Sequence, residues 1–149
     1  MARKNDKVHT AVIIGDAEDK AALLALCPDL PQWPQRWQIA SGDLAVGKHI
    51  VEAFKPFLRH LIQRGLAPKT LRRHRDHLWM LGGELIRRRH EDPDLKSQSV
   101  SELIAELIDD ETGPLIWPCI SESEQDAFDV TCRQLHRFLS DTSAPAHRS

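Results

Sequence analysis

The sequence of 149 residues lacks the motifs that mark the common enzyme active sites. It contains no GxSxG, no HExxH, no P-loop and no dinucleotide fingerprint. Its three cysteines form no CxxC pair, so neither a disulfide framework nor a structural zinc site is indicated. We therefore expect a protein that is not an enzyme and that binds no cofactor.

The sequence also lacks segments that would direct the chain to a membrane. No charged leader precedes an apolar core, and no apolar run approaches the roughly 20 residues that cross a bilayer. An odd number of cysteines at scattered positions, Cys27, Cys119 and Cys132, is typical of a reducing compartment. These absences predict a cytoplasmic protein without a membrane partner.

Charge of both signs is abundant but unevenly distributed. The net charge is −2, yet residues 59–90 carry nine Lys or Arg against two acidic residues. Residues 91–126 reverse this balance, with one basic and eleven acidic residues. Clustered positive charge attracts polyanions. The alternative is that the two blocks face each other within the molecule, although surface ion pairs contribute little to stability.

Hydrophobic periodicity predicts four helices after Gly47. In residues 48–64 the apolar side chains follow a single helical stripe, and Pro56 either bends this helix or marks its start. The second helix is expected to begin near Pro68. Its apolar side is predicted to hold Leu71, His74, Leu78, Leu81, Gly82 and Leu85. Its opposite side is predicted to hold Arg73, Asp76, His77, Glu84 and Arg87.

A capping-box pattern predicts the start of the third helix and of the fourth. Ser99 and Glu102 precede one apolar run, and Ser121 and Glu124 precede the other. In each pair the serine can accept from a free backbone N–H of the first turn. The domain that results, residues 47–140, is predicted to be all-α.

The flanking segments are predicted to stand apart from this helical domain. Residues 1–46 form an N-terminal extension with a short strand at residues 11–14, a helix after Asp16 and a linker rich in proline and tryptophan. The linker tryptophans are expected either to lie over the core or to await a partner. The composition of residues 141–149 predicts a disordered tail.

The strongest candidate site is the beginning of the second helix. Free N–H groups and the positive end of the helix dipole favour an anion there, and guanidinium groups can bond phosphate oxygens or guanine edges. A solvated face, internal ion pairing or another anionic partner are the alternatives. The side chains that carry this prediction are Lys69, Arg72, Arg73, Arg75 and His77.

Metal binding and nucleophilic catalysis are only weakly indicated. His74 and His77 are three residues apart, and Cys132 and His136 are four apart, so each pair can share a helical face. Neither pair has a second pair to complete a site. We expect these residues to have core or surface roles and no metal to be bound.

A stretch of the sequence resembles the N-terminal core-binding, SAM-like domain of tyrosine recombinases and phage integrases. The similar segments are "IVEAFKPFLRHLIQRGLAPKTLRRHRDHLWMLG", "SVSELIAELI" and "SEQDAFDVTCRQLHRFL". In that family four helices bind one side of a DNA duplex, while a separate C-terminal domain cuts it. The resemblance covers residues 47–140 and implies a four-helix SAM-like bundle.

The resemblance also implies which residues face DNA. At the start of the second helix these are Lys69, Thr70, Arg72, Arg73 and His77, and in the fourth helix they are Arg133 and Arg137. The chain contains no tyrosine, so the nucleophile of those enzymes is missing, and residues 141–149 leave no room for a catalytic domain. We therefore expect a non-catalytic protein that binds double-stranded DNA, such as an accessory or regulatory factor of a mobile element.

A protein-interaction module is the competing prediction. In that case Trp33, Trp37 and the loop at residues 113–119 form an apolar docking surface for a protein partner or a second copy. The acidic segment at residues 91–126 either binds a basic partner or repels DNA from part of the surface.

Overall fold

The computed structural model describes residue 18 and residues 20–116 and 119–148, and all regular structure in these residues is helical. The all-α prediction is therefore confirmed for the described part, whereas the strand expected at residues 11–14 lies outside it. No helix within these ranges is long and apolar enough to cross a bilayer. The named elements are η1 (Leu30–Gln32), α2 (Trp33–Trp37), α3 (Asp43–Gln63), α4 (Pro68–Glu91), α5 (Pro93–Lys96), α6 (Val100–Leu107) and α7 (Glu122–Arg148).

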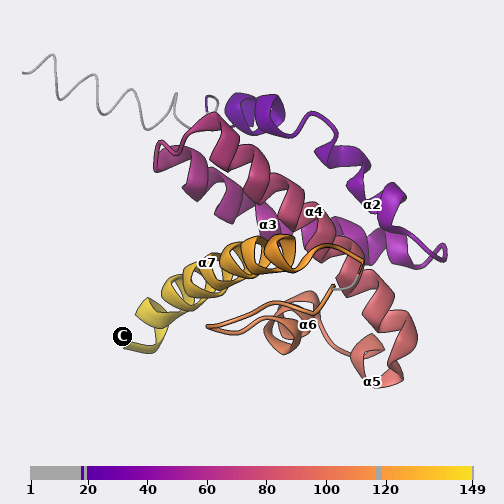
Figure 1. Cartoon of the computed structure of the whole chain (residues 1–149). Helices are drawn as coiled ribbons and strands as arrows, with labels where there is room; N and C mark the ends of the chain where they lie inside the picture. Colours follow the sequence, from indigo (N-terminus) through magenta and orange to yellow (C-terminus); the bar gives the residue numbers. More distant parts are fainter. Residues whose placement is uncertain (1–17, 19, 117–118, 149) are drawn as a thin grey trace, which may run out of the picture.

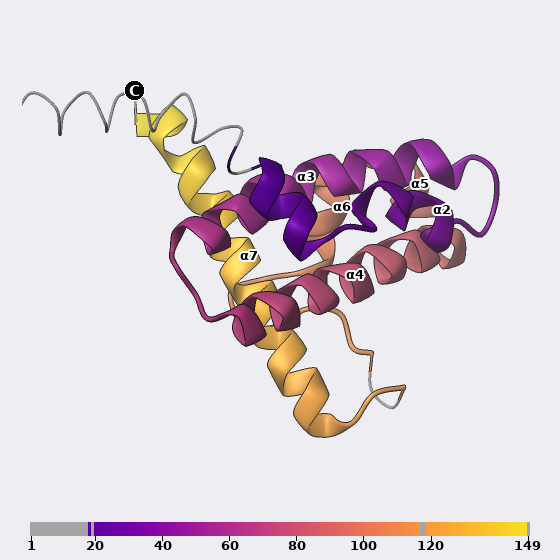
Figure 2. The ribbon, with the colours of Figure 1, turned by 90° about the horizontal axis from the view of Figure 1, so that it is seen from above.

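The two long helices α3 and α4 form an antiparallel hairpin (Figure 1). Gly65 ends the first of them with a φ of 73°, a left-handed conformation that glycine adopts without strain. α7 crosses the hairpin near its connected end (Figure 2). Phe57 of α3 meets Phe138 of α7 at this crossing, with ring centroids 5.6 Å apart. The connected end of the hairpin is thus fixed against α7.

The first long helix begins earlier than expected. α3 starts at Asp43 rather than at residue 48 and continues through Pro56 without a break. The Asp43 carboxylate accepts hydrogen bonds from the backbone N–H groups of Ile39 and Ala40, each at 2.9 Å. These bonds organise the turn that precedes the helix, which periodicity alone does not reveal. The expected domain boundary between residues 46 and 47 falls inside α3.

The Asp43 carboxylate also ties α3 to the end of α4. It is only 3% exposed, lies 2.7 Å from His90 Nε2 and has Arg89 Nη1 at 3.5 Å. Burial opposes its ionisation, but the donors from Ala40, His90 and Ile39 outweigh burial and lower its pKa. Asp43 is therefore an ionised structural link.

The proline- and tryptophan-rich segment is a folded layer, not a linker between parts. Trp33 is 1% and Trp37 is 6% exposed. The Trp37 Nε1–H group donates to the Trp79 carbonyl at 3.0 Å, and its ring lies where a side chain on Gly82 would stand. Of the two expectations for these tryptophans, packing over the core is therefore confirmed and an exposed docking surface built on them is wrong. The missing side chain of Gly82 lets the Trp37 indole enter the core.

Residues 20–26 are helical and add to this layer, with Leu23 and Cys27 buried. Burial raises the pKa of the Cys27 thiol to about 12 and that of Cys132 still further, so both thiols are unreactive packing groups. Cys119, in contrast, is exposed.

The capping signals are confirmed at both later helices. Ser99 and Glu102 form a complete capping box on α6. Ser121 Oγ accepts from the Glu124 N–H at 3.1 Å at the start of α7. α7 continues to Arg148 instead of ending near residue 140.

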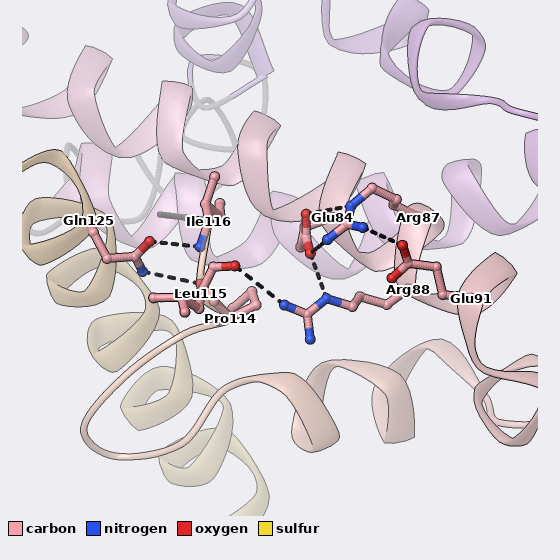
Figure 3. Close-up of polar contacts among 8 residues, drawn as sticks. All are labelled: Glu84, Arg87, Arg88, Glu91, Pro114, Leu115, Ile116 and Gln125. Carbon is pink, nitrogen blue, oxygen red and sulfur yellow. Dashed lines mark hydrogen bonds and ion pairs between the residues drawn. The ribbon is translucent and has the colours of Figure 1, made fainter. Parts of the chain in front are cut away.

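The segment between α6 and α7 is held by side chains rather than by regular structure (Figure 3). Gln125 is buried; its amide oxygen accepts from the Ile116 N–H at 2.7 Å, and its amide nitrogen donates to the Pro114 carbonyl at 3.1 Å. Leu115 lies between these two bonds with its side chain 60% exposed. Gln125 thus holds both Pro114 and Ile116 of this loop against the start of α7.

Candidate nucleic-acid interface

The start of α4 presents positive charge that forms no ion pair with an acidic group of the described residues. Pro68 occupies the first turn, and Ala67 before it supplies no side chain to cap the free N–H groups. Lys69, Arg72 and Arg73 are exposed, and none of them forms an ion pair or side-chain hydrogen bond within the described residues. Side chains and helix end together favour an anion at this place.

A groove of about 580 Å³ runs from this helix start to α7. Its walls are of mixed charge, because Asp76 and Glu124 stand beside the cations. Neither carboxylate lies within ion-pair distance of Lys69, Arg72 or Arg73 in the part of the chain that the structure describes. The full lining is Lys69, Arg72, Arg73, Asp76, His77, Met80, Ser123, Glu124 and Ala127.

Two residues predicted to lie on the side opposite the apolar stripe are buried. His77 is 9% and Glu84 is 8% exposed. The reason is that α4 is covered on two flanks, by α3 and the N-terminal layer on one and by α7 and the loop before it on the other. The periodicity of one helix reveals the main stripe but not the second contact. His77 is thus mainly a structural residue that only borders the groove.

The burial of His77 creates a polar junction between α4 and α7. The hydroxyl of Thr131 lies 2.7 Å from Nδ1 of His74 and 2.7 Å from Nδ1 of His77. Burial lowers the pKa of His74 to about 4, and the charges of His77, Arg64 and Arg73 act in the same direction. Burial also lowers the pKa of His77. Both rings are therefore neutral at pH 7.

Two more of the predicted phosphate contacts are differently placed. Arg75 is half-buried, and its guanidinium donates to the Leu26 carbonyl and to Asp76, both at 2.9 Å. It therefore holds the N-terminal helical segment against α4. Thr70 is also half-buried, beside Lys69 at the helix start.

The two arginines of α7 that the resemblance assigns to DNA contact, Arg133 and Arg137, lie in different surroundings. Arg133 Nη1 donates to the Glu111 carbonyl at 3.0 Å and so faces the loop before α7. Arg137 is exposed and lines a hollow of about 530 Å³ beside the end of α3. Only Arg137 of this pair is available to a ligand.

Sequence reasoning missed Arg64, which the fold brings to the same side. Its guanidinium lies 3.5 Å from Gln134 Oε1 of α7, and it lines the hollow together with Arg137. Both Arg64 and Arg73 are close enough to His74 for their charges to lower its pKa. The only sequence signal was its place just before the turn at Gly65. We call Arg64, Lys69, Arg72, Arg73 and Arg137 the basic surface.

The arginines at the other end of α4 are occupied. Arg87 pairs with Glu84 and, at 2.6 Å, with Glu91, while Arg88 pairs with Glu84 at 2.6 Å (Figure 3). Burial opposes ionisation of Glu84, but the two arginines outweigh it and lower its pKa. Arg88 also donates to the Leu115 carbonyl at 3.4 Å. This cluster builds the fold and is not part of the basic surface.

The acidic residues of 91–126 do not neutralise the basic surface. Among the described residues, the ion pair that this segment makes is that of Glu91 with Arg87. Asp109 instead accepts from the backbone N–H groups of Glu111 and Thr112, both at 2.7 Å, and these bonds lower its pKa. At the start of α4, Glu124 of this segment shares the groove with Lys69, Arg72 and Arg73 but forms no ion pair with them among the described residues.

The described residues contain no group of three or more His, Cys, Asp or Glu side chains placed to hold a metal ion. His74 and His77 point their Nδ1 atoms at Thr131. Cys132 is buried.

Comparison with known proteins adds no identification. No protein-family model matches the chain, and the searches of curated proteins and of solved structures find no match either. The resemblance to integrase core-binding domains therefore remains a prediction from the sequence.

Proposed function

We propose that the protein is a non-catalytic DNA-binding protein whose basic surface contacts the phosphates of a duplex. One observation carries this proposal. Lys69, Arg72 and Arg73 are exposed and unpaired within the described residues, whereas Arg75 and Arg87 of the same helix are engaged in ion pairs. A cluster of cations without internal partners is suited to an external polyanion.

The mechanism is electrostatic attraction followed by local bonding. Guanidinium and ammonium groups neutralise phosphates, and the uncapped backbone N–H groups of Lys69 and Thr70 can donate to one phosphate oxygen. Each neutralised phosphate releases counterions, so three to five contacts give a slope of about −3 to −4.5 in log affinity against log salt. Binding is therefore expected to be weak at physiological salt and largely independent of sequence.

The arrangement of the long helices is compatible with the resemblance. In chain order α3, α4, α6 and α7 would correspond to the four helices that the resemblance implies, and the basic surface draws on α4, α7 and Arg64 at the end of α3. On this basis the protein serves in the cytoplasm as an accessory or regulatory factor of a mobile element. Binding to a second copy or to a protein partner stays a separate prediction.

The test is fluorescence anisotropy with a labelled random duplex over a salt titration. The double substitution Arg72→Ala/Arg73→Ala is expected to weaken binding at least tenfold at low salt and to reduce the slope by about 2. The matched control is Arg36→Ala/Lys96→Ala, which removes the same charge from exposed positions elsewhere. Equal binding by wild type and the Arg72/Arg73 variant, or equal loss in both variants, refutes the site.

A further inference from the structure

A second surface, on the flank of α3, is an apolar groove with a positive rim. It lies between residues 20–26, the η1–α2 segment and α3, and its volume is about 580 Å³. Leu24 is 52% exposed on its wall. The apolar lining consists of Leu23, Leu24, Leu30, Pro31, Pro34 and Val51. An exposed apolar hollow of this kind is typical of a binding site.

The rim of this groove carries a row of cations on α3. Lys48, Lys55 and Arg59 are separated by seven and four residues, so they share one face of the helix over roughly 16 Å. Lys48 and Arg59 have no carboxylate partner within the described residues. Lys55 is half-buried and has Glu52, which also lines the groove, at 2.6 Å; a surface pair of this kind is of low strength. Lys20 adds positive charge from the opposite wall.

We propose that this groove binds an acidic amphipathic helix of a partner protein. The three walls are helices whose backbone groups are bonded internally, so they offer no strand edge to which an extended peptide could add. A helix satisfies its own backbone and can place leucine-like side chains against Leu24 and Val51. Its acidic side then meets the row of cations.

The length of the cation row favours a helix over a small amphiphile. A ligand with a single anionic head would use one cation, whereas Lys48, Lys55 and Arg59 match carboxylates spread over about three helical turns. Affinity for such a helix depends on both apolar burial and charge, and it decreases as salt increases.

The probe is a labelled peptide of about 18 residues with leucine on one face and glutamate on the other, measured by fluorescence anisotropy with the full chain. We expect saturable binding, lost at least tenfold in Lys48→Glu/Arg59→Glu and in Leu24→Asp. A peptide with lysine in place of glutamate keeps the apolar face and is expected not to bind. Circular dichroism of each variant checks that it is folded.

The control Arg72→Glu/Arg73→Glu separates this surface from the DNA-binding proposal. It is expected to lose duplex binding and to retain peptide binding, while Lys48→Glu/Arg59→Glu does the reverse. The groove assignment is overturned if the peptide does not bind at about 0.5 mM. It is also overturned if both charge reversals weaken peptide binding equally. Light scattering that shows a dimer dissociated by Lys48→Glu/Arg59→Glu assigns the groove to a second copy instead.

Discussion

A single hydroxyl group joins the two helices that carry the basic surface. Thr131 of α7 is 1% exposed, and its Oγ1 lies 2.7 Å from Nδ1 of both His74 and His77 of α4. A hydroxyl donates one hydrogen, so at most one of the two ring nitrogens can accept from it. At least one of the rings must therefore carry its proton on Nδ1 and donate to Thr131.

The substitution Thr131→Val removes this hydroxyl while keeping the shape of the side chain. It leaves two buried ring nitrogens without their partner, and each unsatisfied group costs about 1–3 kcal/mol. Because the two bonds share one oxygen, we expect a combined loss of about 2–4 kcal/mol. That loss is a large part of the 5–15 kcal/mol that stabilises a typical domain, so it is readily measured by urea unfolding at neutral pH.

The matched control is Thr142→Val on the same helix. The hydroxyl of Thr142 is exposed and donates to the Leu139 carbonyl at 3.0 Å, so its removal should change the free energy of unfolding by less than about 0.5 kcal/mol. Equal effects of Thr131→Val and Thr142→Val would refute the junction. Nitrogen NMR of the imidazole rings is an independent check, because finding both His74 and His77 protonated only on Nε2 contradicts the geometry.

Two further predictions concern α4. A Cβ at Gly82 would lie 2.2 Å from the Trp37 ring, whereas one at Gly83 would meet it at 3.4 Å. Gly82→Ala should therefore lower the free energy of unfolding by about 1–3 kcal/mol. Gly83→Ala should leave it unchanged or raise it by up to about 1 kcal/mol. Equal effects of the two substitutions in urea unfolding would contradict this packing of Trp37. The pKa values of His74 and His77 are lower in the folded protein than in the unfolded chain, so below pH 6.5 the unfolded chain binds more protons than the folded protein. The free energy of unfolding should therefore fall as the pH drops from 6.5 toward 5. The slope of the free energy of unfolding against pH is at most about 1.4 kcal/mol per pH unit for each histidine. The substitution His74→Gln should reduce this slope. A free energy of unfolding that does not change with pH in this range would contradict the burial of the neutral rings.

The parts of the fold that sequence predicted are those determined by local chemistry. Pro68 lies in the first turn of α4, where a backbone N–H would have no partner within the helix. The missing N–H of proline therefore costs nothing at this position. Ser99 and Ser121 each accept from the first turn of the helix that follows, as their spacing to a glutamate indicates. The apolar stripe of α4 is confirmed at Leu78 and Leu81, both fully buried.

The parts that sequence did not predict depend on which distant segment covers a residue. Trp33 and Trp37 look like linker residues in a stretch interrupted by prolines, and only the space above Gly82 makes them core residues. In the sequence nothing distinguishes Arg75 from its neighbours Arg72 and Arg73. In the fold Arg75 donates to the Leu26 carbonyl. Such assignments require the packing of segments about 40–50 residues apart in the chain.

Both ends of α4 carry three closely spaced cations. The two ends differ in whether a carboxylate one helical turn away is free to pair with these cations. Arg87 and Arg88 have Glu84 three and four residues before them, but Asp76, which could serve Arg72 and Arg73, is bonded to Arg75. The unpaired cations also stand toward the positive end of the helix dipole, where positive charge is unfavourable by about 0.3–1 kcal/mol for each charge in the first turn. Fold stability therefore does not account for them, and residues that cost stability without an internal partner are typical of functional surfaces. Arg72→Ala/Arg73→Ala should accordingly leave the free energy of unfolding unchanged or slightly raised while DNA binding is lost. A loss of more than about 1 kcal/mol in urea unfolding would show that these arginines support the fold instead.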